Sequence, residues 1–344
     1  MTDAADETPD RPVDEEPEVI IEADAPSTES PSDDEAASPS FEEAAEEELR
    51  DERPSRRENF AATGPLDIDI TITSGRVTVH LVDEPLAGVE IVHEPGSENP
   101  FMQSISSIVD WVSRFGEGQN PNPQSELAKA AVEESRISLV GQRLAVVGPK
   151  QRLRMVPLAV TVRAPSGSHV SVRSGSADVT MTGAAGRVNV ETGSGEVAID
   201  RADGYASIAT GTGALRLGPM LGGLKARSGS GEIEVSSVGG AATVSTGSGD
   251  VWFGAVQDNV TAKTGSGDLT IADGASGDID LTTGSGEIRV GVRAGTSAMI
   301  DLVSRSGQAR SELDVQQRTG ADAPKIRLRA RTSSGNVVVT SAIG

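Results

Sequence analysis

The chain has 344 residues, a formal net charge of −22 and a pI near 4.5, with 36% hydrophobic and only 2% aromatic residues. It contains no cysteine, which excludes a disulfide framework, a thiolate nucleophile and a cysteine metal site. The scarcity of aromatic residues argues against an enzyme with a large aromatic-lined pocket, and the acidic pI without a basic aromatic platform argues against nucleic-acid binding.

Residues 1–60 form a compositionally distinct segment rich in Asp, Glu, Pro, Ser and Ala. Between Met1 and Asn59 there are 22 acidic residues against 5 arginines. Such a segment buries too little apolar surface to offset its chain entropy, so we predict a disordered acidic tail, followed by a single β-domain over residues 61–344. A solubilising role and a role as an interaction arm both stay open for this tail.

The N-terminus does not resemble a secretory signal. Met1–Asp10 carries acidic residues where a signal peptide has a basic region followed by an apolar one. The sequence also has no run of about 18 apolar residues that would cross a membrane as a helix. We therefore predict a cytoplasmic location.

The first predicted ordered segment begins near Pro65. Apolar residues alternate with polar ones over 68–72 and again over 77–81, with a turn at Thr73–Arg76 between them. This alternation is typical of strands with one buried face, so we expect an irregular first coil. Val89 and Ile91 indicate a further short strand.

A helical period interrupts the strands over residues 97–135. One apolar face of an amphipathic helix is indicated by residues at steps of four and three: Phe101, Ile105, Ile108, Val112 and Phe115. Glu126–Glu134 indicates a second short helix. Because the open end of a solenoid exposes unpaired backbone and bare core, we predict that this insertion caps the N-terminal end, with a partner-binding helix as the alternative. Membrane contact is not predicted, since Arg114 is the only cation of the first helix.

One short phrase of the type Thr-Gly-Ser-Gly-Glu-Val recurs between Ser174 and Val290. Its first glycines lie 18 residues apart, with one final step of 19: Gly175, Gly193, Gly211, Gly229, Gly247, Gly265 and Gly284. Each period holds two pairs of apolar residues spaced two apart, so it contains two strands and two turns and has no room for a helix. We predict an all-β, single-domain β-solenoid (a parallel β-helix) of about 18 residues per coil, most regular over residues 170–292.

After Val290 the spacing loosens, and Ser306-Gly307 and Ser334-Gly335 are degenerate copies of the phrase. Lys325–Arg331 alternates strictly between cationic and apolar residues. This pattern predicts a strand with Ile326, Leu328 and Ala330 facing the core and four cations facing outward.

The most regular polar feature is an acidic column three residues after the first glycines: Asp178, Glu196, Glu232, Asp250, Asp268 and Glu287. On adjacent rungs these carboxylates would stand about 4.8 Å apart. Like charges at this spacing repel, which leaves open a solvated negative face or a bound cation such as calcium.

Stacked hydroxyls open the repeated phrases: Thr192, Thr210, Ser228, Thr246, Thr264 and Thr283. We interpret them as turn hydrogen-bonders, because a catalytic serine or threonine needs a base and no G-x-S-x-G motif is present. The three histidines, His80, His93 and His169, lie outside the regular coils and are predicted to be surface or edge residues. No phosphate-binding loop is present either, so we predict no catalytic, cofactor-binding or metal residue and no enzyme activity.

The phrases of the form [ST]-G-[ST]-G-[DE]-[VIL] resemble a bacterial β-strand-repeat family of unknown function labelled "putative adhesin", whose relatives include the toastrack domains of envelope-stress proteins. The resemblance covers about Pro65–Ser341, and residues 170–197 are especially similar to actinobacterial members. It implies a β-solenoid without known catalysis, associated in some relatives with envelope-stress signalling or surface attachment. It assigns no functional residues.

These observations predict a non-enzymatic structural and interaction scaffold that acts through protein contacts, including self-association through the solenoid ends. The contrast between the basic strand at Lys325–Arg331 and the acidic tail favours this hypothesis. A surface adhesin or cell-envelope attachment factor is the first alternative. A carbohydrate-active β-helix enzyme is the second, and only the fold class favours it.

Overall fold

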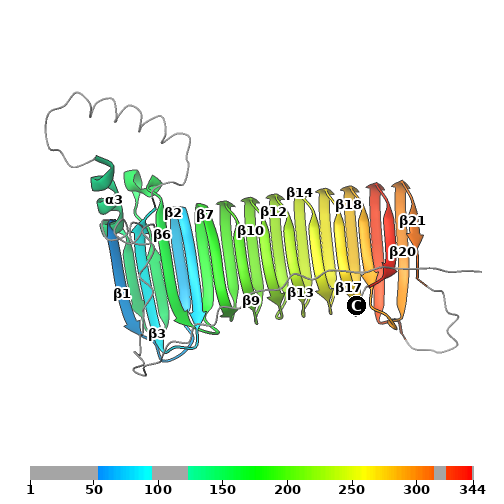
Figure 1. Ribbon diagram of the computed structural model, residues 1–344, viewed down its shortest axis with the longest axis horizontal. Helices are drawn as coiled ribbons and strands as arrows, with labels where there is room; N and C mark the ends of the chain where they lie inside the picture. Colours follow the sequence, from blue (N-terminus) through cyan, green and yellow to red (C-terminus); the bar gives the residue numbers. More distant parts are fainter. Residues whose placement is uncertain (1–52, 95–122, 314–322, 343–344) are drawn as a thin grey trace, which may run out of the picture. The chain divides into compact units, whose positions relative to one another are not determined.

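The computed structural model describes residues 53–94, 123–313 and 323–342, which build one β-domain (Figure 1). Its N-terminal elements are β1 (Ser55–Ala61), β2 (Asp67–Val82), β3 (Leu86–His93), α3 (Pro123–Glu134), β4 (Arg136–Val140), β5 (Arg143–Val147), the 3-10 helix η1 (Gln151–Met155), β6 (Leu158–Pro165) and β7 (His169–Ala185). The predicted helix over residues 101–115 and the predicted tail up to residue 52 lie outside the described residues.

The regular coils follow in sequence order and form two ladders of strands. The first ladder contains β8 (Val188–Ser194), β10 (Ala206–Thr212), β12 (Leu224–Ser230), β14 (Ala242–Ser248), β16 (Val260–Ser266) and β18 (Gly277–Ser285). The second ladder contains β9 (Val197–Ala202), β11 (Leu215–Met220), β13 (Ile233–Val238), β15 (Val251–Val256), β17 (Leu269–Gly274) and β19 (Ile288–Val292). Every strand pairs in parallel with the strand one coil away, so the predicted parallel solenoid is confirmed.

The register of the ladders is one repeat per rung. Ile208 pairs with Val190 on one side and with Ala226 on the other, and all three side chains face the core. The two ladders contribute to a single apolar core cluster. One further inward position was not predicted from the sequence. It is the last residue of β7 and of most strands of the second ladder, and it is buried: Ala185, Ala202, Met220, Val238, Val256 and Val292.

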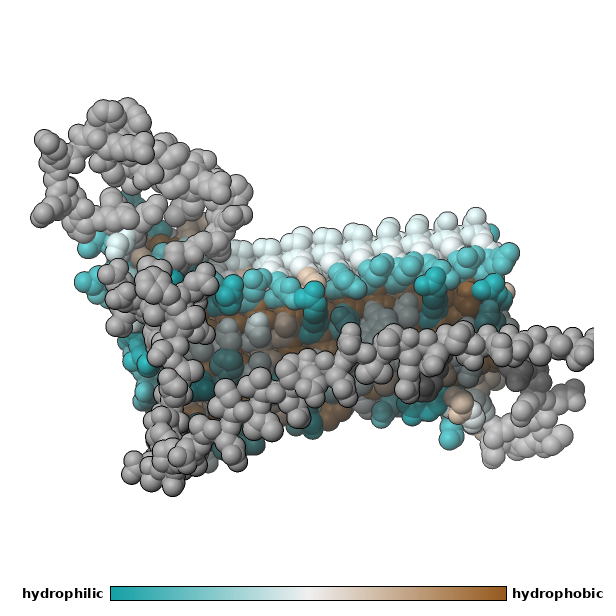
Figure 2. Space-filling model, in the orientation of Figure 1, coloured by the Kyte–Doolittle hydropathy of each residue, from teal (hydrophilic) through white to brown (hydrophobic). Residues whose placement is uncertain are grey.

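The repeated phrases form the turns that join the two ladders, and their small residues make a pale row along one edge of the stack in Figure 2. In six of the seven phrases the second glycine has a positive φ, a conformation that other residues rarely adopt; the first phrase has Ala177 at this place. Gly249 has a φ of +148°, and a Cβ atom there would lie 2.2 Å from the carbonyl oxygen of Gly231 on the previous rung. Glycine is therefore required at this position by both backbone conformation and space.

The N-terminal coils are not stacked in sequence order. Strand β2 lies between β7, which it pairs with in parallel, and the later strands β5 and β6. Beyond them the pairing becomes antiparallel: β3 pairs with β6 and with β1, and β4 pairs with β5. The parallel rungs of the solenoid therefore end at a small antiparallel edge.

Strand β1 corrects the predicted boundary of the tail. Residues 55–60 fall in the segment predicted to be disordered, but they form an edge strand on β3. Its side chains are mostly polar, and Phe60 is its one large apolar residue, partly buried against the core, so it lacks the apolar alternation that identifies a strand. It is held by backbone pairing and by charge pairs such as Arg57–Glu90 (2.5 Å).

Helix α3 confirms the second predicted helix and packs on β1 and β3 through its apolar face. Ala131 and Val132 of this face belong to the core cluster. At the end of the helix, the Arg56 guanidinium of β1 donates a hydrogen bond to the carbonyl oxygen of Ser135 (2.7 Å). Helix α3 thus covers part of the N-terminal edge.

The C-terminal coils also depart from sequence order. They consist of β20 (Ala298–Ser306), β21 (Ala309–Ser311), β22 (Ile326–Ser334) and β23 (Val337–Ser341). Strand β22 lies between β18 and β20, and β23 lies between β19 and β21. The last coil in the sequence is therefore inserted one rung before the end of the stack, and the earlier β20–β21 coil forms the terminal rung.

Candidate functional site

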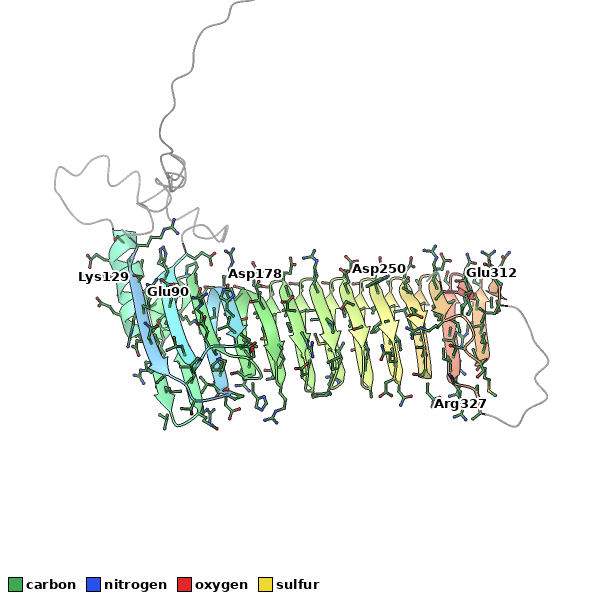
Figure 3. All side chains as sticks on the ribbon, turned by 60° about the horizontal axis from the view of Figure 1, so that its bottom comes forward. Glu90, Lys129, Asp178, Asp250, Glu312 and Arg327 are labelled. Carbon is green, nitrogen blue, oxygen red and sulfur yellow. The ribbon has the colours of Figure 1, made fainter. Side chains whose placement is uncertain are left out.

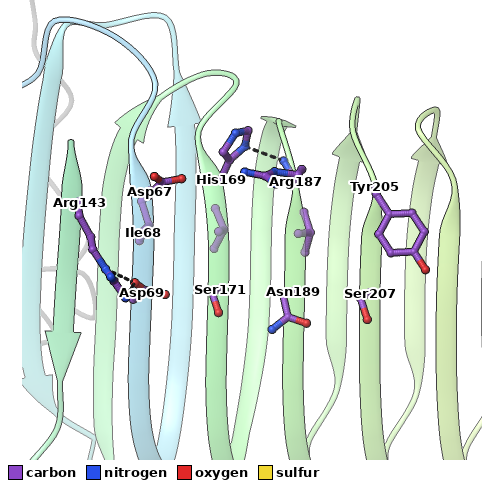
Figure 4. A pocket seen from close by; sticks show the side chains of 12 residues that line it. Asp67, Ile68, Asp69, Arg143, His169, Ser171, Arg187, Asn189, Tyr205 and Ser207 are labelled. Carbon is purple, nitrogen blue, oxygen red and sulfur yellow. Dashed lines mark hydrogen bonds and ion pairs between the residues drawn. The ribbon is translucent and has the colours of Figure 1, made fainter.

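A shallow groove of about 440 Å³ lies on the outer face where β2, β7, β8 and β10 run side by side (Figure 4). Ser171, Asn189 and Ser207 occupy one outward row of these adjacent strands. A second row nearer the turns contains Asp67, His169, Arg187 and Tyr205, and Arg143 of β5 closes the end of the groove opposite Tyr205. Alternation along the strands aims all of these side chains away from the core.

Hydrogen bonds fix two parts of the groove. The Arg143 Nε atom donates to Asp69 Oδ2 (2.7 Å), which orients both side chains across β5 and β2. The backbone N–H of Arg187 donates to His169 Nδ1 (3.0 Å), so the neutral ring carries its proton on Nε2. Arg143 and Arg187 balance Asp67 and Asp69 in charge, so the groove is polar but close to neutral.

The groove was not predicted from the sequence, which indicated only that aromatic residues such as Tyr205 are scarce. Its other members come from the irregular N-terminal strands β2 and β5 and from the first regular coils, so no single sequence motif unites them. Aligning the coils on their glycines places Asn189 and Ser207 in one column, which was the only available signal.

The acidic column runs along the turn edge, where Figure 3 labels Asp178 and Asp250. Its aspartates bond to the next rung: Asp178 Oδ1 accepts from the N–H of Glu196 (2.9 Å), and Asp250 Oδ1 accepts from the N–H of Asp268 (2.8 Å). Glu196 also pairs with Arg216. These contacts give the column a structural role between rungs and favour the solvated face over a bound cation. In the described part of the chain, no group of three or more His, Cys, Asp or Glu residues is arranged to hold a metal ion.

The hydroxyl column lies near the ends of the first-ladder strands, just before the turns, and is buried: Thr192, Thr210, Ser228, Thr246, Thr264 and Thr283 are at most 7% exposed. Four of these six hydroxyls bond to backbone carbonyls; Thr264 Oγ1, for example, donates to Ser266 (3.1 Å) and to Gly249 (3.2 Å). The Ser228 and Thr246 hydroxyls have no partner among the described residues. Buried turn hydroxyls of this kind are poor candidates for nucleophiles.

The three histidines lie on three different strands and do not share a site. His80 Nδ1 is 2.9 Å from the Thr182 hydroxyl, and His169 lines the groove. Burial lowers the pKa of His93 below its usual range, and the nearby Arg53 charge lowers it further. His93 therefore favours the neutral form.

The basic strand is explained by its place in the stack. Ile326, Leu328 and Ala330 of β22 are buried, as predicted. Acidic residues of β18 and β20 lie close to its outward arginines. Arg329 is in register with both Asp280 and Asp301, Arg327 pairs with Asp278 (3.9 Å), and Arg331 pairs with Asp301 (3.5 Å). The basic face is thus largely balanced within the stack.

The terminal rung is covered on one side only. Within the described residues, β20 pairs with β22 and β21 pairs with β23, and neither has a second partner strand on its outer side. Ile300 and Leu302 are half-buried, and Met299 (60% exposed) and Val303 (42% exposed) face outward. This rung therefore combines an open backbone edge with exposed apolar side chains.

None of the helices in the described ranges is long and apolar enough to span a bilayer.

Comparison with known proteins places most of the coils in one family. The family model described as Toastrack DUF4097 matches residues 154–340, which is more than half of the chain. No curated protein matches the chain.

Solved structures give weak overall superpositions at low identity. A "putative adhesin" from Bacteroides fragilis is 12% identical with a TM-score of 0.39, over 83% of this chain and 96% of that chain. A "putative adhesin" and a "putative lipid binding protein" from Parabacteroides distasonis are each 10% identical over the same shares, with TM-scores of 0.29 and 0.30. The matched family model is decisive: the chain belongs to the Toastrack DUF4097 family.

Proposed function

We propose that this protein is a non-enzymatic scaffold that acts through protein contacts, including contacts between its own solenoid ends. The proposal rests on the terminal rung β20–β21, which in the described part of the chain has partner strands on one side only. An open parallel edge beside exposed apolar side chains is a ready template for pairing with another strand. The first partner that we propose is a second copy of this chain.

Chemical features of the domain support the absence of catalysis in this proposal. The regular hydroxyls are buried in turns, the aspartates of the acidic column bond to backbone, and the histidines lie apart from one another. A stack of parallel rungs with few loops suits a rigid spacer better than a reaction cleft.

We also propose a cytoplasmic location and a role in envelope-stress regulation. The resemblance of residues 170–197 supports the further proposal that the chain is of the actinobacterial type of the family. Cell fractionation tests the location: recovery in the soluble cytosolic fraction supports the scaffold, and recovery at the cell surface supports the adhesin alternative instead.

Sedimentation velocity over a wide concentration range tests the proposed contact. We expect concentration-dependent association that Val303→Lys weakens, because the substitution places a charge beside the open edge. Leu221→Lys is the matched control, since Leu221 is equally exposed (42%) but lies in a turn between regular coils. A strictly monomeric protein, or equal effects of the two variants, would contradict the proposal.

The tail is tested separately by deletion of residues 1–50, which leaves β1 intact. If the acidic segment is an interaction arm, the deletion changes the salt dependence of self-association and the partners recovered by pull-down. If neither changes, the tail has no binding role and acts only as a solubilising segment.

A further inference from the structure

The groove on β2, β7, β8 and β10 offers side chains but no free backbone. Each of the four strands is paired on both sides: β2 with β5 and β7, β7 with β2 and β8, β8 with β7 and β10, and β10 with β8 and β12. A peptide therefore cannot add to this face as an extra strand. Recognition here has to come from the outward side chains.

Charge narrows the class of ligand further. Asp67 and Asp69 stand in the same groove as Arg143 and Arg187, and Asp69 is already bonded to Arg143. A strongly acidic ligand would meet two carboxylates, and a strongly basic one would meet two guanidinium groups. The groove therefore fits an uncharged ligand rich in hydrogen-bonding groups.

The aromatic ring of Tyr205 offers an apolar surface on which a ligand can pack. Tyr205 is the only tyrosine of the chain, is 48% exposed and stands at one end of the groove (Figure 4). A half-exposed phenol offers a flat apolar face together with a hydroxyl that can donate or accept. A sugar ring has the matching combination of an apolar C–H face and a rim of hydroxyls.

The remaining side chains match the hydroxyls of such a ligand. Asn189 offers both a donor and an acceptor, Asp67 offers acceptors and Arg187 offers a fork of donors. Asp67 begins β2, whereas Arg187 directly precedes β8 and Asn189 lies at its start, and β7 runs between these two strands. Four strands span about 14 Å, because neighbouring strands lie about 4.8 Å apart. This length exceeds a single sugar ring.

We propose that the groove binds a neutral oligosaccharide, with one sugar ring on Tyr205 and further hydroxyls bonded by Asp67, Arg187 and Asn189. This site is separate from the terminal rung β20–β21. Its failure would therefore leave the proposed scaffold function untouched, and the reverse also holds.

The test uses saturation-transfer NMR and titration calorimetry of the full chain with cellotetraose, maltotetraose and N-acetylchitotetraose, and with tetragalacturonate as a charged probe. We expect saturation transfer to at least one neutral probe and weaker or no transfer to the charged one. Tyr205→Ser should weaken the binding about tenfold, and Asn189→Ala should weaken it several-fold.

Two matched variants separate recognition from general effects. Trp252→Ser removes another outward aromatic residue, from β15 of the second ladder, and Thr243→Ala alters the row of Asn189 on β14; both should leave the affinity unchanged. Thermal unfolding shows whether each variant is folded. The proposal is overturned if no neutral probe shows transfer, if tetragalacturonate binds more tightly, or if folded Tyr205→Ser binds as well as the unchanged protein.

Discussion

The regular coils and the two ends of the domain are both built from β-strands, but the order in which the strands stack differs between them. In residues 188–292 each coil stacks on the one before it, and every rung is covered on both sides. At the ends, β2 and β22 are inserted between strands that come later or earlier in the chain. Equal spacing therefore determines the stacking in the middle, whereas the stacking at the ends depends on contacts between distant segments.

This difference has an energetic basis. A middle rung shares its core and its backbone hydrogen bonds with two neighbours, so its stability comes from both interfaces. The terminal rung β20–β21 has one such interface within the described residues. Ile326, Leu328 and Ala330 of the inserted strand β22 are buried, whereas Ile300 and Leu302 of the terminal β20 are only half-buried.

The largest expected effect concerns the turns of the regular coils. Gly249→Ala should lower the free energy of unfolding by at least about 3 kcal/mol, because the new Cβ meets the Gly231 backbone and the positive φ is strained. Gly295→Ala is the control: its φ is also positive, but no atom lies within 4 Å of the added Cβ. Urea unfolding measures both, and equal costs would show that the turns are not closely stacked.

The next prediction compares two leucines that occupy the same row of the first ladder. Leu281 is fully buried between β16 and β22, and Leu302 is half-buried on the terminal rung. Leu281→Ala should cost about 2–5 kcal/mol, and Leu302→Ala should cost less than half as much. If the two costs are the same in urea unfolding, the terminal rung is covered as completely as the middle ones.

A smaller effect distinguishes two hydroxyls within the regular coils. Thr264→Val should cost about 1 kcal/mol because its hydroxyl bonds to backbone carbonyls, whereas Thr246→Val should be close to neutral because that hydroxyl lacks a partner. Chemical denaturation of the two variants checks this. A larger loss for Thr246→Val would indicate a hydrogen bond that this geometry does not contain.

The smallest effect concerns the charges around the inserted strand. Arg331→Glu should lower the free energy of unfolding by about 1 kcal/mol at low ionic strength, because its pair with Asp301 is exposed. Arg227→Glu is the control in the same outward row, where the neighbours Ala209 and Ser245 are uncharged. The difference between the variants should vanish in concentrated salt. A difference that persists there would contradict an electrostatic origin.

The middle of the domain was predictable because the sequence pattern within each coil determines the structure of that coil. The glycine spacing fixes the coil length, and the alternation around residues such as Val197 and Ile199 fixes which side is buried. Four of the six stacked hydroxyls bond to backbone carbonyls, as their place in the repeated phrases suggested, whereas Ser228 and Thr246 have no partner among the described residues. The acidic column was identified as a feature, but its bonds to the next rung required coordinates.

The ends and the groove were not predictable in the same way. Strand β1 has no apolar alternation that would predict a strand. The sequence of residues 67–82 and 326–341 predicts strands but does not indicate between which neighbouring strands they lie. The positions of these strands are determined by pairing between segments far apart in the sequence. Arg329 of β22, for example, is in register with Asp280 of β18 and with Asp301 of β20. The groove depends on the same choice, because β2 brings Asp67 and Asp69 beside the first regular coils.

The order of the C-terminal rungs can be measured directly, since the chain has no native cysteine. Thr282 of β18 and Arg331 of β22 are register partners, whereas Thr282 and Val303 of β20 are separated by the inserted strand. Two neighbouring Cα atoms permit a disulfide, but atoms two strand spacings apart, about 10 Å, do not. We predict that the double variant Thr282→Cys/Arg331→Cys crosslinks under mild oxidation and that Thr282→Cys/Val303→Cys does not. Crosslinking of the second pair in place of the first would contradict the inserted coil.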